Sequence, residues 1–233
     1  NNKIKLISLK EKRKEINKIT STAEHALALT LNSLRMIFQA HNSIKKNQWN
    51  YENFIGRQVN QLNFGILGFG RLGKYYSKYV EALGANVHIY DPYKLKVKKK
   101  YKKHKNIISF VKNIDVLSIH VHYNSETHQM INKSILSKMK KDVLIVNTSR
   151  GEVINENDLI HFLNKNKNSK YSTDVLTDET KFLKSKLFKM SKNNNRQVFI
   201  TPHIGGMTID GRKIAYNKAA NDLIRFFEQY EKN

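Results

Sequence analysis

The sequence predicts an α/β fold in which a doubly wound parallel sheet is covered by helices on both faces. Two observations lead to this prediction. From residue 62 onward, apolar runs of strand length alternate with runs of helical periodicity, a pattern typical of repeated βαβ units. The first apolar run also leads into three closely spaced glycines, which are typical of a turn from a strand into a helix.

The strands are predicted from short runs rich in Val, Ile and Leu. They are residues 63–67, 86–90, 116–120, 143–147, 171–175 and 198–200. Such continuous apolar runs are typical of parallel strands that are buried on both faces. Helices are predicted between most of them, at residues 72–83, 107–113, 132–138 and 156–164.

Further helices are predicted at both ends of this alternation. Residues 20–40 carry apolar side chains on one helical face, and Ser21 or Thr22 can cap the helix with Glu24 nearby. Residues 210–230 form an amphipathic final helix by the same criterion. Weaker signals come from the first residues, which are read as a strand at 4–7 and a charged helix at 10–17.

The charge of the chain invites a nucleic-acid interpretation, which its composition weakens. The formal net charge is +23 over 233 residues, but 34 of the 42 basic residues are Lys, and Asn is also abundant. Lys and Asn share AT-rich codons, so genomic base composition accounts for both. The densest run, residues 93–105, has eight Lys and no acid. Lys-only runs usually form a solvated face, and only Tyr93 and Tyr101 supply aromatic support, so we do not expect a nucleic-acid partner.

Composition also bounds the compartment and the chemistry. Hydrophobic residues make up 39% of the chain, enough for a packed core, and there is no Cys. Disulfides and thiolate metal sites are therefore excluded, and we expect no metal. No apolar run approaches the roughly 20 residues that span a bilayer, and no signal peptide is visible, so we expect a cytoplasmic protein without membrane contact. The first residue is not Met, which suggests a processed or partial product.

A dinucleotide site is predicted where the first strand ends. Gly68, Gly70 and Gly73 have the spacing G-x-G-x-x-G between an apolar strand and a helix, which is the context that a Rossmann-type fold requires. Gly68 permits a tight turn, Gly70 lets the backbone approach a pyrophosphate, and Gly73 lets helix and strand pack closely. The helix N-terminus adds amide donors and a favourable dipole.

The next strand indicates which dinucleotide binds. It ends at Tyr90 and Asp91, and Asp91 lies 21 residues after Gly70. A carboxylate there can accept hydrogen bonds from both ribose hydroxyls and repels a 2′-phosphate, which favours NAD over NADP. The lysines from Lys94 onward leave NADP open, because a cation near the ribose can accommodate the phosphate.

Three polar residues follow later strands and suggest chemistry. Arg150 follows the strand at 143–147, and its fork can hold a carboxylate by two hydrogen bonds. His203 follows the last strand and can act as acid or base near neutral pH. Glu179 lies in the loop after residues 171–175 and can orient an imidazole. Each residue alone has a structural explanation, but carboxyl ends of parallel strands meet at one edge of a sheet.

Together these segments resemble the D-isomer-specific 2-hydroxyacid dehydrogenases. The matching motifs, from about residue 20 to the end, are Thr22-Ala-Glu-His25, Gly68 to Gly73, Tyr90-Asp-Pro92, Leu117-Ser-Ile-His120, Asn147-Thr-Ser-Arg-Gly151, Asp174-Val175 with Glu179, and Thr201-Pro-His203-Ile-Gly-Gly206. The resemblance implies hydride exchange between NAD and a 2-hydroxy or 2-oxo acid, with 3-phosphoglycerate or a sugar acid as candidate substrates.

The resemblance also assigns roles. Arg150 binds the substrate carboxylate and polarises the carbonyl, His203 exchanges the hydroxyl proton, and Glu179 holds His203. The residues that it places around NAD are Gly68, Gly70, Arg71, Leu72, Gly73, Tyr90, Asp91, His120, Val121, Asn147, Thr148, Ser149, Arg150, Asp174, His203, Gly205 and Gly206. Arg71 and Leu72 lie on the pyrophosphate, and Asp174 lies near the nicotinamide.

The domain organisation departs from the family's pattern. We expect residues 1–19 to be a remnant of an N-terminal substrate-binding domain, residues 20–206 to bind the dinucleotide, and residues 207–233 to return toward the substrate domain. The chain is then a fragment or a shortened protein. Thr180 and His122 also replace prolines usual in the family. The helix after Thr20 resembles the family's dimer helix, so we expect a homodimer. The alternatives are a non-catalytic NAD-sensing protein and, less favoured, a nucleic-acid binder using the lysine run.

Overall fold

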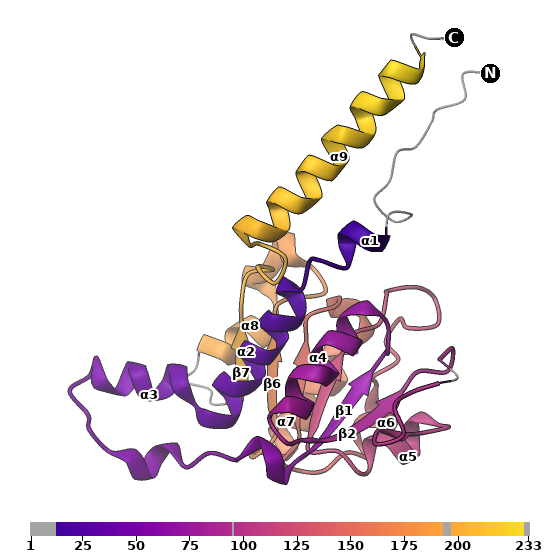
Figure 1. The fold of residues 1–233 in the computed structure, drawn as a ribbon. Coiled ribbons are helices and arrows are strands. Elements are labelled where there is room, and N and C mark those ends of the chain that lie inside the picture. Colours follow the sequence, from indigo (N-terminus) through magenta and orange to yellow (C-terminus); the bar gives the residue numbers. More distant parts are fainter. Residues whose placement is uncertain (1–12, 95, 193–196, 231–233) are drawn as a thin grey trace.

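The computed structural model describes residues 13–94, 96–192 and 197–230. Its centre is a parallel sheet flanked by helices (Figure 1). The sheet has seven strands in the order β3-β2-β1-β4-β5-β6-β7. The strands are β1 (Asn63–Leu67), β2 (Asn86–Tyr90), β3 (Lys102–Lys103), β4 (Val116–Ile119), β5 (Leu144–Asn147), β6 (Lys170–Thr173) and β7 (Val198–Ile200). The doubly wound α/β prediction is therefore confirmed.

Helices connect the strands and cover the sheet. The α-helices are α1 (Arg13–Ile16), α2 (Ser21–Arg35), α3 (Ile37–Ile44), α4 (Arg71–Ala82), α5 (Ile107–Val111), α6 (Lys133–Leu136), α7 (Glu156–Lys165), α8 (Lys186–Lys192) and α9 (Ile209–Tyr230). Short 3-10 helices are η2 (Tyr51–Phe54), η3 (Val59–Gln61), η4 (Gly151–Val153) and η5 (Glu179–Lys184).

The strand order reverses at the centre of the sheet. β1 pairs with β2 on one side, where Leu67 lies opposite Tyr90, and with β4 on the other, where Leu67 lies opposite Ile119. The connections from β1 and β4 therefore leave in opposite directions and open a crevice at the carboxyl ends of these strands. This is the edge at which the sequence places the glycine turn.

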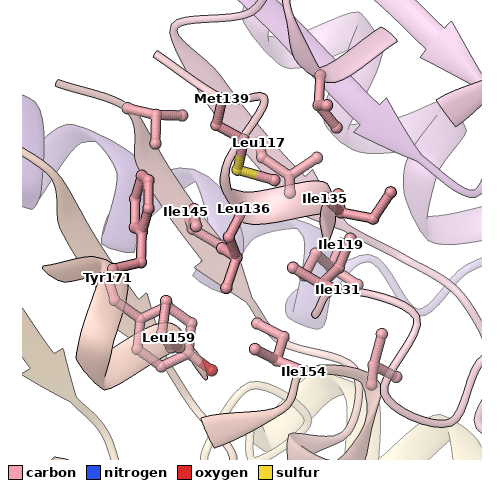
Figure 2. Packing of buried hydrophobic residues seen from close by; sticks show 14 of the residues in the cluster. Leu117, Ile119, Ile131, Ile135, Leu136, Met139, Ile145, Ile154, Leu159 and Tyr171 are labelled. Carbon is pink, nitrogen blue, oxygen red and sulfur yellow. The ribbon is translucent and has the colours of Figure 1, made fainter. Parts of the chain in front are cut away.

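Two hydrophobic clusters lie on opposite faces of the sheet. One packs Leu117, Ile119 and Ile145 from the strands against helices such as α6 and α7, through Leu136 and Leu159 (Figure 2). The other packs the alternate strand residues, which include Val116, Leu144 and Val146, against α2 and α4. Because successive strand residues point to opposite faces, one apolar run supplies both clusters.

The predicted helix over residues 20–40 is wrong in one respect: it is two helices, α2 and α3. Met36 separates them in the left-handed conformation, with φ 52° and ψ 39°, and its N–H donates to the carbonyl of Asn32. Met36 is buried, at 8% exposure, so packing of its side chain stabilises the left-handed backbone at this position. A right-handed helix cannot continue through a residue in that conformation. The turn directs α3 and the segment that contains η2 away from the sheet (Figure 1).

Some predicted boundaries are shifted and some elements were missed. The strand predicted at residues 116–120 ends at Ile119, the strand predicted at 143–147 begins at Leu144, and the strand predicted at 171–175 covers Lys170–Thr173. Strand β3 was not predicted, because its two exposed lysines carry no apolar signal. The helices η5 and α8 were also missed. The strand predicted at 4–7 lies outside the described residues, and so does the first part of the helix predicted at 10–17.

The lysine run is partly a structural element. Within it, β3 pairs with β2, and Lys98 and Lys100 form ion pairs with Glu81 of α4. Hydrogen bonds from Lys100, Tyr101 and Lys98 lower the pKa of Glu81 to about 2. Part of the positive charge in the run therefore holds the segment after β2 against α4.

The last helix extends away from the sheet (Figure 1). Ile209, Leu223, Ile224 and Phe227 of α9 are between 47% and 85% exposed. Among the described residues, α9 has neither the length of apolar sequence nor the hydropathy that would let it cross a membrane, and the same holds for every other helix.

Candidate functional site

The turn after β1 uses its glycines for different physical reasons. Gly68 has φ 88°, and a Cβ there would lie 2.8 Å from the carbonyl oxygen of His120. A Cβ on Gly73 would lie 2.1 Å from the carbonyl oxygen of Gly68, so α4 and β1 approach closely only without it. A Cβ on Gly70 would meet nothing within 4 Å. Gly68 and Gly73 therefore shape the turn, and the space beside Gly70 is open to a ligand.

A cleft of about 1400 Å³ begins at this turn and runs along the carboxyl ends of β1, β2 and β4. The predicted cofactor residues that line it are Gly68, Gly70, Arg71, Leu72, Tyr90, Asp91, His120 and Val121. The structure thus brings together eight residues that the sequence spreads over more than fifty positions. His122, Glu126 and several lysines of the run, among them Lys94 and Lys96, also line the cleft.

Asp91 lies between the ends of β2 and β1 and is 9% exposed. Its Oδ2 accepts the N–H of Phe69 at 2.7 Å, and its Oδ1 accepts the N–H of Tyr93 at 2.9 Å. Each carboxylate oxygen has two lone pairs, so both can also accept a ribose hydroxyl. The two backbone bonds fix the carboxylate at the wall of the cleft.

Arg71 opens α4 and has a partner that the sequence did not indicate. Its Nη1 donates to the carbonyl of Ile19, in the segment between α1 and α2. Tyr75, one turn later, donates its hydroxyl to the carbonyl of Asn17 at 2.6 Å. Burial lowers the pKa of Arg71 from its usual value. The cofactor turn is therefore tied directly to the segment that precedes α2.

His120 follows β4 and lies beside the cleft as a neutral ring. Burial lowers its pKa to about 3. Its Nε2 lies 2.8 Å from the hydroxyl of Ser118, and its ring centroid lies 5.0 Å from that of Tyr76. At neutral pH the ring therefore contributes shape and a hydrogen bond, and it contributes no charge.

Asn147 ends β5 and organises the loop that follows. The side chain is fully buried. The Oδ1 of Asn147 accepts two hydrogen bonds from Ser149, from its N–H at 3.0 Å and from its hydroxyl at 2.8 Å. The Nδ2 of Asn147 donates to the carbonyl of Arg150 at 2.9 Å. Thr148 is also buried, and its Oγ1 has no hydrogen-bond partner among the described residues.

Arg150 is exposed at the end of this loop, and its Nη1 donates to the carbonyl of Ser149 at 2.6 Å. The next residue, Gly151, has no room for a side chain, because a Cβ would lie 2.2 Å from the backbone of Leu176. The segment after β6 therefore crosses against the loop that presents Arg150. The guanidinium keeps most of its donors available for a carboxylate.

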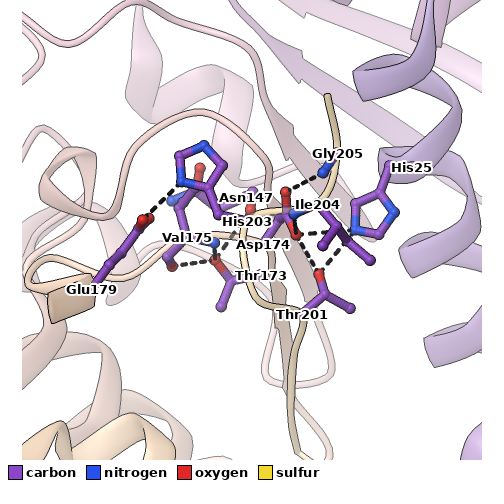
Figure 3. A network of polar contacts seen from close by, with 10 residues as sticks. All are labelled: His25, Asn147, Thr173, Asp174, Val175, Glu179, Thr201, His203, Ile204 and Gly205. Atoms are coloured by element: carbon purple, nitrogen blue, oxygen red, sulfur yellow. Dashed lines mark hydrogen bonds and ion pairs between the residues drawn. The ribbon is translucent and has the colours of Figure 1, made fainter. Parts of the chain in front are cut away.

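The structure brings His203 and Glu179 together, as the sequence predicted. His203 Nδ1 lies 2.8 Å from Glu179 Oε2, and the two side chains are 45% and 42% exposed (Figure 3). Asp178 caps η5 by accepting the N–H of Lys181, which fixes the start of the helix that carries Glu179. The contact with Glu179 uses Nδ1, the nitrogen next to the Cβ branch, and leaves the other ring nitrogen, Nε2, out of this pair.

Asp174 is the centre of a network under the His203 loop (Figure 3). Its Oδ2 accepts the N–H of Gly205 at 2.7 Å, and its Oδ1 accepts the N–H of Ile204 at 2.9 Å and the hydroxyl of Thr201 at 2.6 Å. His25 of α2 places its Nε2 3.3 Å from the same Oδ1. Burial alone would raise the pKa of Asp174, but the hydrogen bonds from His25, Thr201 and the two amides outweigh it and lower the pKa.

The sequence alone did not predict a function for His25 or Thr201. The signal that could have found them is their place inside two of the matching motifs. Gly205 packs beside the network, since a Cβ there would lie 2.9 Å from Asp174 Oδ2, whereas a Cβ on Gly206 would meet nothing within 4 Å. Across the described ranges, His, Asp and Glu side chains form no cluster of three that would suit a metal ion.

Two parts of the site thus share one edge of the sheet. The cleft lies at the ends of β1, β2 and β4, and Arg150 and His203 follow β5 and β7 on the other side of the switch point. A glycine turn opening a helix, a carboxylate at the end of β2 and a His–Glu pair at the far strands define a dinucleotide-binding domain with acid–base groups beside it.

Comparison with known proteins agrees with this class and names the family. Residues 27–205 match the NAD binding domain of the D-isomer specific 2-hydroxyacid dehydrogenases. The chain belongs to this family, and its cofactor is NAD.

Relatives of known name resemble most of this chain. D-3-phosphoglycerate dehydrogenase of Archaeoglobus fulgidus is 32% identical over 206 residues, and that of Bacillus subtilis is 28% identical over 208 residues. Both alignments cover 88% of this chain and 38% of the relative, so the chain spans well under half the length of these enzymes. The crystal structure of D-lactate dehydrogenase from Aquifex aeolicus, complexed with NAD and lactic acid, superposes with a TM-score of 0.80 at 28% identity, covering 91% of this chain and 68% of that one.

Proposed function

We propose that this chain forms the cofactor-binding part of an NAD-dependent oxidoreductase that transfers a hydride between NAD and a 2-hydroxy or 2-oxo acid. The observation that carries the proposal is the His203–Glu179 pair, with 2.8 Å between Nδ1 and Oε2. The pair follows β6 and β7 at the same edge of the sheet as the glycine turn and Arg150. An oxo acid needs a cation at its carboxylate and a proton donor at its carbonyl, and this edge offers both.

The residues of the turn fit the cofactor. The N-terminal amides of α4 and the open space beside Gly70 suit a pyrophosphate, and Asp91 suits the adenosine ribose. Thr148, whose buried hydroxyl has no partner among the described residues, and Ser149 suit the nicotinamide side. Bound NAD supplies the hydride acceptor, or NADH the donor.

The remaining chemistry falls to this chain's own side chains. Arg150 holds the substrate carboxylate through two parallel hydrogen bonds and polarises the adjacent carbonyl. Because Glu179 engages Nδ1, His203 exchanges its proton with the substrate oxygen at Nε2. Glu179 sets the orientation of the ring, as the third member of a nucleophile–base–acid set does elsewhere. 3-Phosphoglycerate is a candidate substrate, because the relatives from Archaeoglobus fulgidus and Bacillus subtilis are named for it.

The proposal includes a partner and a neighbouring domain. Ile37, Trp49, Tyr51 and Ile55 lie in or just after α3 and are 55%, 88%, 80% and 79% exposed. We call residues 37–55 the arm, and a second copy of the chain that covers the arm would remove these side chains from water, as in a homodimer. The exposed apolar face of α9 would likewise pack on a substrate-binding domain, to which residues 1–19 also belong.

The test begins with NADH fluorescence on mixing with the chain, followed by NADH oxidation with a panel of 2-oxo acids that includes the oxidised form of 3-phosphoglycerate. Saturable binding and turnover that is lost in His203→Gln support the proposal. Saturable binding without turnover of any acid supports a non-catalytic NAD-sensing protein instead. Absence of NADH binding by the folded chain overturns both the oxidoreductase and the NAD-sensing protein. Salt-sensitive DNA binding would then support a nucleic-acid-binding function that uses the lysine run.

A further inference from the structure

We propose that His25 of α2 is a positioning residue for the His203 loop, acting through Thr201 and Asp174. The inference rests on the proposed function and deepens it, because it gives α2, which packs on one face of the sheet, a part in supporting the acid–base residue His203. It begins from the three contacts that join His25, Thr201 and the buried carboxylate of Asp174 (Figure 3).

The direction of the hydrogen bonds follows from their acceptor. Asp174 is 2% exposed and its carboxylate can only accept, so the Thr201 hydroxyl 2.6 Å from Oδ1 must donate to it. That hydroxyl lies 2.9 Å from His25 Nε2 and has already spent its proton. It therefore accepts a hydrogen bond from the imidazole, and His25 carries its hydrogen on Nε2. The chain of donation runs from His25 to Thr201 and on to Asp174.

The carboxylate in turn holds the backbone around His203. The N–H groups of Ile204 and Gly205 both donate to it, at 2.9 and 2.7 Å. The N–H of His203 donates to the carbonyl of Asp174 at 2.9 Å. His203 itself has φ 54°, in the left-handed region that a residue with a Cβ occupies only at an energetic cost.

This conformation needs support from outside the loop. Asp174 provides it: the hydroxyl of Thr201 donates to Oδ1 beside the amide of Ile204, and His25 holds that hydroxyl in place. The ring of His25 also lies beside the loop, 3.5 Å from where a Cβ on Gly205 would be. When the donor at position 25 is lost, the loop relaxes and His203 leaves the position in which Nδ1 meets Glu179.

The side-chain chemistry supplies a matched pair of variants. His25→Gln keeps an N–H donor close to the position of Nε2, and His25→Leu keeps the bulk without a donor. Because His25 is absent from the lining of the cofactor cleft, neither variant changes a residue of that cleft. Thr201→Val and Thr201→Ser form a second pair, which breaks or keeps the next link of the same chain.

The experiment is amide hydrogen exchange, read for Ile204 and Gly205 and for the β1 strand as an internal reference. Loss of one hydrogen bond in the network should raise exchange at both loop amides by about tenfold in His25→Leu and Thr201→Val. His25→Gln and Thr201→Ser should restore the parent rates, and exchange in β1 should stay unchanged in all four. Where the chain turns over a 2-oxo acid, kcat should fall about tenfold or more in the Leu and Val variants with the KM for NADH unchanged.

Two results would overturn the proposal. One is parent-like exchange at Ile204 and Gly205 in both His25→Leu and Thr201→Val. The other is equal loosening in the Gln and Leu variants together with faster exchange in β1, because His25 would then matter for packing alone. If His25→Leu does not fold, the Thr201 pair decides by the same criteria. Absence of NADH binding in the parent would overturn the proposed function and leave the exchange result to be judged separately.

Discussion

Gly70 and Gly73 lie three residues apart, and substitution by alanine should affect a different property at each: NADH binding at position 70 and stability at position 73. A Cβ at position 73 would lie 2.1 Å from the Gly68 carbonyl oxygen, so Gly73→Ala should lower the free energy of unfolding by about 3 kcal/mol. A Cβ at position 70 enters open space, so Gly70→Ala should change stability by less than about 1 kcal/mol. It should weaken NADH binding by about tenfold, because the methyl group takes space meant for the pyrophosphate.

Urea unfolding and NADH fluorescence titrations measure the two effects on the same samples. Each variant serves as the control for the other. Full NADH affinity in Gly70→Ala would contradict the assignment of the turn to the pyrophosphate, whatever the stability of the variant.

Arg150 tests the other half of the site. Arg150→Gln removes the charged fork that would hold a substrate carboxylate, and it leaves the cofactor cleft unchanged, since Arg150 does not line it. We expect kcat/KM for a 2-oxo acid to fall by at least about 100-fold, with the dissociation constant for NADH within about twofold of the parent. A larger change in NADH affinity than in kcat/KM would place Arg150 at the cofactor.

For single residues, prediction from the sequence succeeded where one motif holds both partners or where topology brings strand ends together. The spacing of Gly68 and Gly73 was enough to predict the turn that they form. The position of Glu179 and His203 after strands that end at one edge of the sheet was enough to predict that they lie close together. Prediction from the sequence did not find the bond from Arg71 to Ile19 or the contact of His25 with Thr201, because each joins segments that no periodicity relates. The carboxylate of Asp174 is engaged by protein donors, so its contact with the nicotinamide stays a prediction.

Among the elements, the edge of the sheet contains a buried histidine pair that was not anticipated. His104 follows β3, and its Nε2 lies 3.0 Å from Nδ1 of His88 on β2, with the ring centroids 5.1 Å apart. Burial first, then the neighbouring charges of His104 and Lys102, lower the pKa of His88 to about 4, while Asp115 opposes the shift and Lys140 adds to it. Burial also lowers the pKa of His104.

This pair predicts how stability depends on pH. The unfolded His88, with a pKa of about 6.5, binds a proton before the folded one does. The contribution of His88 to stability is therefore complete above pH 6.5 and is lost as the pH falls toward 4, at up to about 1.4 kcal/mol per pH unit. His120, with a folded pKa of about 3, adds a similar slope.

Denaturant unfolding between pH 7 and 4 should show this slope. His88→Gln should reduce it by up to about 1.4 kcal/mol per pH unit, because Gln does not titrate. If the free energy of unfolding depends on pH equally steeply in His88→Gln and in the parent, the lowered pKa of His88 is contradicted.

The helix break and the edge strand show why element boundaries were harder to predict than the elements themselves. The apolar periodicity continues through Met36, so nothing in the pattern marks the left-handed residue between α2 and α3. Strand β3 pairs only two residues, both lysines, and its place depends on β2 beside it. Propensity and periodicity describe single segments, and both of these features are set by contacts between segments.

For the whole molecule, the exposed apolar surface of the arm predicts its oligomeric state. Tyr51 and Ile55 are 80% and 79% exposed, so Tyr51→Lys combined with Ile55→Lys should convert a dimer into a monomer. Ile209→Lys, at an 85% exposed position at the start of α9, is the matched control and should leave the dimer intact. Sedimentation equilibrium measures both. A monomeric parent, or dissociation by Ile209→Lys alone, would contradict the assignment of the arm to a second copy.

The proposed function depends on the dinucleotide site at the ends of β1 and β2, because the acid–base residues gain a function only beside bound NAD. The most direct measurement is titration of NADH and NADPH into the folded parent chain, followed by nucleotide fluorescence. We predict saturable NADH binding with a dissociation constant below about 1 mM and NADPH binding weaker by about tenfold, because the Asp91 carboxylate opposes a 2′-phosphate. NADH fluorescence that stays unchanged across the titration, with a chain that remains folded, would contradict the central claim.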